Sequence, residues 1–203
     1  RNLKEYWDMD SELLNFYIDD VPAKEMPKGE KLNLINIGDV NGNKGQEVLA
    51  RAFAMLDSET KEKCNLYFCG DNQRFNEQLL LEVLDFVDAN ENVHMLEGMP
   101  KAELYEVYDE VDIVVVASYY ESTSAVAVEG MMKGKLCVCT ETCGVCDYLQ
   151  NGESVITFKQ GDADSLKDAL YKAINEYDSL HSIRENGRKV YEQVYTREVF
   201  QKN

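Results

Sequence analysis

The chain has 203 residues, a formal net charge of −17, and 44% hydrophobic and 10% aromatic residues. This composition argues against a disordered chain, and the acidity argues against nucleic acids and anionic membranes as partners, because both bind basic surfaces. Apolar stretches such as Val111–Ser118 fall well short of the ~20 residues that a membrane span needs. The first residues do not resemble a signal peptide, so we expect a cytoplasmic protein. The sequence does not begin with an initiator methionine, so we expect it to be a piece of a longer chain.

The predicted elements begin near residue 31. Before that point, Pro22 and Pro27 lie among polar residues, which predicts that residues 1–30 are a linker or leader from a preceding domain. Strands are predicted at 32–38, 65–70, 93–96, 111–118, 136–140 and 154–158. Helices are predicted at 46–56, 75–87, 101–108, 125–132, 164–176 and 183–196.

Alternating strands and helices of these lengths are typical of an α/β domain with a parallel sheet and right-handed crossovers. The six strands predict a doubly wound, Rossmann-like fold over residues 31–203. In such folds the ligand lies at the carboxyl ends of the strands. The residues that follow each strand are therefore the candidates for chemistry.

The loop after the first strand runs from Gly38 to Gly45 and places Lys44 just before a helix. A lysine there can neutralise a phosphate that lies over the helix N-terminus. The loop matches neither G-x-G-x-x-G nor the Walker A motif, which argues against a dinucleotide dehydrogenase or an ATPase. An ordinary loop with a solvated lysine is the alternative.

Glycines also follow the second and third strands, at Gly70 and Gly98. Glycine lets a ligand approach the backbone closely, although turn formation explains each of them equally well.

The fourth strand leads to two glutamates, Glu121 in a loop and Glu129 eight residues further on in a helix. Small polar residues at 122–124 between them are suited to capping that helix, whose free N–H groups would face an anion. The two carboxylates would flank this anion and accept hydrogen bonds from sugar hydroxyls. Two surface glutamates on a capped helix are the alternative.

Taken together and in order, these residues resemble the retaining glycosyltransferases of family 4, which have the GT-B fold. The resemblance extends from about residue 32 to 191, in the C-terminal domain of that fold. The matching features are Gly38 with Lys44-Gly45, Gly70-Asp71, Gly98 with Glu103-Leu104 and Tyr108, Glu121 with Glu129, Thr140 with Gly144 and Asp147, Asn151-Gly152, and Gly161-Asp162.

The resemblance implies two catalytic-site residues. Glu121 would contact the transferred sugar, and Lys44 would neutralise charge that develops on the departing diphosphate. The family usually has Arg directly after the first-strand glycine, where this chain has Asp39. A carboxylate repels a diphosphate, so either Asp39 points away from it or the site is weakened or altered.

The resemblance also implies a set of donor-binding residues. Glu129 would bind the ribose hydroxyls, the helix start would hold the diphosphate, and the third-strand turn would line the base pocket. The implied residues are Gly38, Gly70, Gly98, Met99, Ser122, Thr123, Ser124, Ala125 and Glu129.

The function implied by the resemblance is retaining transfer of a hexose from a UDP- or GDP-sugar, without a metal or other cofactor. The acceptor would be a glycan or a lipid-linked molecule held by an N-terminal domain, as in polysaccharide biosynthesis, and only that domain would contact a membrane. This chain alone would bind the donor without transferring it. A non-catalytic module of the same fold, favoured by Asp39, and another GT-B enzyme such as a sugar epimerase are the alternatives.

Four cysteines cluster at Cys137, Cys139, Cys143 and Cys146. Cys137 and Cys139 alternate along one predicted strand and therefore face the same side. Zinc sites usually pair two knuckles across a loop, so the pattern favours buried reduced thiols over an oxidation-prone pair or a metal site.

Overall fold

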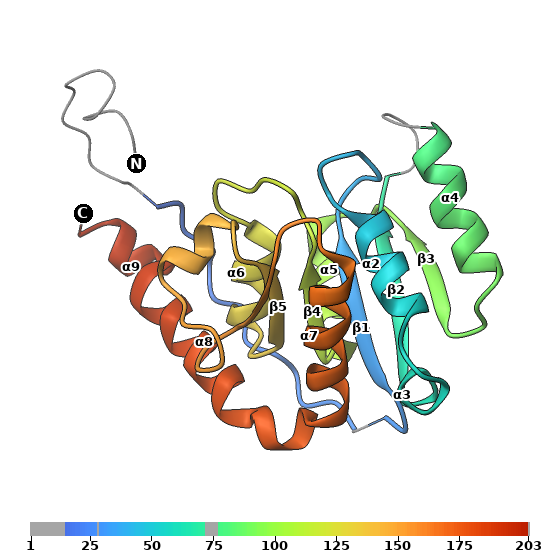
Figure 1. Ribbon diagram of the computed structural model, residues 1–203. Coiled ribbons are helices and arrows are strands. Elements are labelled where there is room, and N and C mark those ends of the chain that lie inside the picture. Colours follow the sequence, from blue (N-terminus) through green and yellow to red (C-terminus); the bar gives the residue numbers. More distant parts are fainter. Residues whose placement is uncertain (1–14, 28, 72–76, 203) are drawn as a thin grey trace.

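The computed structural model describes residues 15–27, 29–71 and 77–202 (Figure 1). Its centre is one parallel sheet of six strands in the order β3-β2-β1-β4-β5-β6. The strands are β1 Leu32–Ile37, β2 Cys64–Gly70, β3 Val93–Glu97, β4 Ile113–Val116, β5 Leu136–Thr140 and β6 Ile156–Phe158. The predicted doubly wound, Rossmann-like fold is therefore confirmed.

Helices cover both faces of the sheet (Figure 1). One layer contains α2 Gln46–Ala54, α3 Ser58–Glu62, α4 Glu77–Asp88 and α7 Ala163–Asn175. The other contains α5 Lys101–Glu110, α6 Ala125–Met132 and α8 His181–Val194, which continues into α9 Arg197–Phe200. Short 3-10 helices, η1 Gly144–Asp147 and η2 Tyr177–Leu180, connect these elements. The described part of the chain contains no helix that is both long and apolar enough to cross a membrane.

The two helical layers pack on alternate residues of each strand. In β1, Leu34 belongs to the core on the α2 side and Ile35 to the core on the α6 side. In β4, Ile113 and Val114 divide in the same way. Burial on both faces explains why these strands are continuous apolar runs rather than alternating ones.

The predicted fourth strand is longer than the observed one, which ends at Val116. Ala117 and Ser118 are buried but leave the sheet. The carbonyl of Ala117 packs against Gly45, and the Ser118 hydroxyl donates to Glu121 over 3.0 Å. An apolar run does not distinguish a strand residue from a buried residue that leads into a site.

The described part of the predicted linker, residues 15–27, has no regular secondary structure and packs against the domain. Ile18 is buried, its N–H donates to the carbonyl of Tyr195, and its carbonyl accepts from the hydroxyl of Tyr191. Arg188 binds Asp20, so this segment is tied to α8. The domain boundary near residue 31 stays a prediction.

All six cysteines are free. Cys137 and Cys139 belong to the same core layer, which confirms that they face the same side of the sheet. Burial raises the pKa of Cys137 to about 12, so its thiol stays protonated at neutral pH.

Candidate functional site

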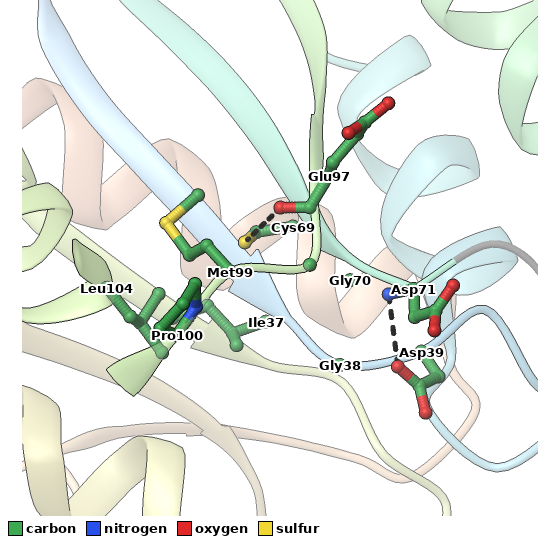
Figure 2. Close-up of a pocket in the computed structure, with 11 residues that line it drawn as sticks. Ile37, Gly38, Asp39, Cys69, Gly70, Asp71, Glu97, Met99, Pro100 and Leu104 are labelled. Atoms are coloured by element: carbon green, nitrogen blue, oxygen red, sulfur yellow. Dashed lines mark hydrogen bonds between the residues drawn. The ribbon is translucent and has the colours of Figure 1, made fainter. Parts of the chain in front are cut away.

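A pocket of about 620 Å³ opens at the carboxyl ends of β1, β2 and β3 (Figure 2). This is the edge of the sheet where a doubly wound fold binds its ligand. Four of the predicted site residues line the pocket, namely Gly38, Gly70, Gly98 and Met99. The other lining residues are Ile37, Asp39, Cys69, Asp71, Glu97, Pro100 and Leu104.

Two of these glycines are required by contacts within the protein. A Cβ added at Gly70 would lie 2.2 Å from the carbonyl oxygen of Gly38. Gly38 has a φ of 146°, and a Cβ there would lie 3.2 Å from the side chain of Lys44. The ends of β1 and β2 therefore pack backbone to backbone, and Lys44 extends beside the pocket wall.

The pocket wall is acidic. Asp39, Asp71 and Glu97 line it, and the eleven described lining residues include no lysine or arginine. The side chain of Asp39 turns toward Asp71 and accepts its backbone N–H over 3.1 Å (Figure 2). Asp39 thus connects the ends of β1 and β2. It does not point away from the pocket but forms part of its wall.

The two predicted catalytic residues lie together. Lys44 Nζ is 2.5 Å from Glu121 Oε1, and the same oxygen accepts a hydrogen bond from Ser118. The side chain of Lys44 is 27% exposed and that of Glu121 is 17% exposed. This pair is accessible to a ligand, yet sheltered enough for its charges to interact more strongly than in bulk water.

The loop that carries Glu121 packs against the residues that follow β5. Gly144 donates its N–H to the carbonyl of Glu121 over 3.0 Å. A Cβ at Gly144 would lie 1.7 Å from the carbonyl oxygen of Ser122. Glycine is therefore required at 144 for this loop to take its place.

The predicted helix start is confirmed at α6. Ser124 is its N-cap and accepts the N–H of Ala127 over 3.3 Å. Ser122 and Ala125 are exposed, Thr123 is half-buried and Ser124 is buried. These residues adjoin Glu121 and are not among the described residues that line the pocket.

Glu129 is buried in α6 and paired on both oxygens. Oε1 lies 2.9 Å from the ammonium of Lys101, and Oε2 accepts the hydroxyl of Tyr108 over 3.2 Å. Burial and the charge of Glu129 raise the pKa of Tyr108, so this hydroxyl remains a donor. Burial alone would lower the pKa of Lys101, but its bonds to Glu129 and Tyr105 raise it overall.

Sequence reasoning missed Lys101, which links Glu129 to the pocket. Lys101 is the first residue of α5 and follows Pro100, which lines the pocket. Its position just after the third strand was the available signal, because such residues lie at the ligand-binding edge of the sheet. Ser118, whose hydroxyl donates to Glu121, was missed as well.

The arrangement suits a ligand that carries both an anion and hydroxyl groups. The N-terminus of α6 and the ammonium of Lys44 attract negative charge. Glu121 and Glu129 provide acceptors for hydroxyl groups on either side. Apolar side chains of Ile37, Met99 and Leu104 offer a surface for a flat ring in the adjoining pocket.

Comparison with known proteins assigns the family. The family model described as glycosyl transferases group 1 matches residues 18–190, and the chain belongs to this family. It is 33% identical over 149 residues to the D-inositol 3-phosphate glycosyltransferase of Corynebacterium jeikeium (strain K411). That match covers 70% of this chain and 35% of the relative, so the chain spans about a third of the length of the curated relatives it matches.

Solved structures agree on the fold. Anabaena Alr3699/HepE in complex with UDP superposes with a TM-score of 0.76 at 18% identity, over 85% of this chain and 47% of that one. The C-terminal domain of the group 1 glycosyl transferase LpcC from Francisella tularensis gives a TM-score of 0.74 at 17% identity, over 82% of this chain and 87% of that domain.

Proposed function

We propose that this chain is the C-terminal, donor-binding half of a GT-B glycosyltransferase that transfers a hexose from a UDP- or GDP-sugar with retention of configuration. The observation that carries the proposal is the Lys44–Glu121 pair at the start of α6, next to a glycine-lined pocket. Family membership supports the reaction class. The UDP complex of the Anabaena protein, which shares this fold, supports the ligand class.

In this proposal the donor lies across the ends of β1 to β4. The base occupies the pocket beside Gly98 and Met99, and the ribose hydroxyls bind Glu129 in place of part of its bond with Lys101. The diphosphate lies over the helix start at 122–125. The residues at that start provide backbone N–H groups without a partner within the helix.

The chemistry assigned to the pair is electrostatic. The ammonium of Lys44 moves from Glu121 to the departing diphosphate and stabilises the charge that develops there. Glu121 is then free to accept hydrogen bonds from the transferred sugar. Neither residue is assigned a covalent role, and the site is proposed to work without a metal ion. The glycan or lipid-linked acceptor is assigned to an N-terminal domain, and this half alone is proposed to bind without transfer.

A titration of this chain tests the donor site. Thermal unfolding is followed with UDP, GDP and ADP at fixed salt and with EDTA present. A ligand that binds only the folded state stabilises it by about 2.7 kcal/mol at a hundredfold excess over its dissociation constant. We expect one of the uridine or guanosine diphosphates to do so without a divalent ion, which would also identify the base.

Two variants make the titration specific. Glu129→Gln retains an oxygen acceptor for Tyr108 but loses the charge, and we expect it to lose most of the ligand-induced shift. Glu185→Ala removes an exposed carboxylate from α8 and is expected to leave the shift intact. Absence of a shift with every diphosphate, in the wild type and in the full-length protein, would overturn the donor-site proposal.

A non-catalytic nucleotide-binding module is the second candidate. The acidic pocket wall favours it, because Asp39 stands beside the proposed diphosphate. Transfer or hydrolysis of the identified nucleotide sugar by the full-length protein would exclude this reading. Tight binding without any turnover would favour it.

A further inference from the structure

Asn43 joins the loop of Lys44 to the loop of Glu121 by three hydrogen bonds. Its carbonyl accepts the N–H of Tyr119 over 2.8 Å. Its side-chain oxygen accepts the N–H of Tyr120 over 3.1 Å, and its side-chain nitrogen donates to the carbonyl of Tyr120 over 2.8 Å. The two segments are 77 residues apart in the sequence.

The position of this contact ties it to the predicted catalytic pair. Asn43 directly precedes Lys44, and Tyr120 directly precedes Glu121. On the other side of Lys44, a Cβ at Gly45 would lie 2.1 Å from the carbonyl oxygen of Ala117. The backbone on both sides of Lys44 is therefore fixed to the chain that carries Glu121.

The side chain of Asn43 fits this task by its length and chemistry. Its amide group binds both the N–H and the C=O of Tyr120, one as acceptor and one as donor, as the backbone of a neighbouring strand would. The loop presents Asn43 in a set conformation, because its own N–H donates to the side chain of Asn41 over 2.9 Å. Aspartate at 43 would retain the acceptor but place a second oxygen against the carbonyl of Tyr120.

We infer that Asn43 is a positioning residue that sets the distance between Lys44 and Glu121. A lysine side chain is flexible, and holding it in one geometry costs conformational entropy. Anchoring the backbone next to it reduces the volume that its ammonium samples. The active pair is thereby pre-organised before the donor arrives. The roles of Lys44 and Glu121 in this inference rest on the proposed function, whereas the brace itself does not.

A labelling experiment without any nucleotide tests the brace. The folded chain is treated briefly with an amine-reactive acetylating reagent, and modification of each lysine is measured by mass spectrometry. We expect Asn43→Ala to label Lys44 several-fold faster than the wild type. Asn175→Ala, which removes a side chain with hydrogen bonds to Thr60 and Tyr171, serves as the control and is expected to leave Lys44 unchanged. Equal labelling of Lys44 in all three proteins would overturn the inference.

A double-mutant cycle tests the functional step. Asn43→Ala is expected to weaken UDP or GDP binding about tenfold in the wild-type background, since a small displacement of a positioned group is costly. In the Lys44→Met background the same change is expected to have no further effect, because the two residues act through one contact. Equal losses in both backgrounds would show a merely structural role and overturn the inference.

A second variant covers the case in which Asn43→Ala fails to fold. Asn43→Asp retains the bond from the N–H of Tyr120 and is expected to give an intermediate labelling rate. In the full-length enzyme it should lower kcat more than it changes KM, because the pair acts on the departing diphosphate. If no diphosphate binds either this chain or the full-length protein, the proposed function fails, and the labelling result still decides whether Asn43 positions Lys44.

Discussion

The ion pair of Asp109 and Lys133 allows a worked prediction of stability. Lys133 Nζ lies 2.7 Å from Asp109 Oδ1, and the side chains are 1% and 4% exposed. The same oxygen of Asp109 accepts the N–H of Lys24, which ties residues 15–27 to α5. Asp109→Ala therefore leaves a buried ammonium without its counter-charge and frees part of the N-terminal segment.

The expected cost of Asp109→Ala is large. Breaking a buried ion pair by removing one partner costs about 3–5 kcal/mol, and the lost bond to Lys24 adds about 1 kcal/mol. A domain of this size is typically stable by only about 5–15 kcal/mol, so about a quarter or more of the total would be lost. Urea unfolding at pH 7, followed by circular dichroism, measures the change.

Two comparisons make this prediction refutable. Asp168→Ala breaks a pair with Lys167 in which the carboxylate is 76% exposed, and we expect a cost of at most about 1 kcal/mol. Asp109→Leu combined with Lys133→Met removes both charges and should recover most of the stability. If Asp109→Ala costs no more than Asp168→Ala, or if the double variant is as unstable as the single one, the buried-charge argument is wrong.

Three further predictions concern the site and the core. In the full-length enzyme, Lys44→Ala should lower turnover by roughly 10²–10³-fold, the scale of one lost electrostatic donor, and unchanged turnover in a transfer assay would contradict the role. Gly45→Ala should lower the thermal midpoint strongly. The φ of 66° alone costs alanine ~1–2 kcal/mol, and the clash of the new Cβ, 2.1 Å from the Ala117 carbonyl oxygen, adds to that cost. Burial raises the pKa of Cys137 from 9.0 to about 12. The protonated thiol therefore contributes fully to the free energy of unfolding below pH 9, and this contribution is lost as the pH rises toward 12. Raising the pH to about 10.5 should therefore cost the wild type roughly 2 kcal/mol more than Cys137→Ala in urea unfolding.

The fold could be predicted from the sequence because burial on both faces leaves a strong pattern. Residues 113–116 are all β-branched and apolar, as a central parallel strand requires. The same pattern led to a predicted strand that continued to Ser118, because residues buried in a loop are as apolar as residues buried in a sheet. The short helix α3 was missed because it is only Ser58–Glu62, capped by Asp57.

The candidate site was predictable only in part. Gly38, Gly70 and Gly98 follow strands, and parallel strands bring their carboxyl ends to one edge. The pairing of Lys44 with Glu121 could not be derived from spacing, because it depends on how two loops 77 residues apart pack. Asn43 looked like an ordinary turn residue, and only its three bonds to the other loop distinguish it.

The charge of the chain bears on how an anion is held in the proposed site. A net charge of −17 produces a field that repels a diphosphate at long range. At short range, Lys44 and Lys101 neutralise Glu121 and Glu129, so these two pairs add no net charge beside the proposed diphosphate, whereas Asp39 on the pocket wall adds a negative one. The long-range part is screened by salt, with a Debye length of ~30 Å at 0.01 M and ~10 Å at 0.1 M, whereas direct contacts are screened much less.

The affinity of the proposed site for a diphosphate should therefore depend on salt in the opposite direction from that of most phosphate sites. Most phosphate sites lose affinity as salt rises, because their basic surroundings attract the ligand from a distance. Here the affinity for UDP or GDP should stay level or rise between 0.01 and 0.1 M NaCl, measured by calorimetry with EDTA present. The corresponding nucleoside, which lacks the diphosphate, should show no such change. A clear fall in diphosphate affinity over the same range would mean that local cations dominate the field around the site, and the acidity of the chain would then have no bearing on donor capture.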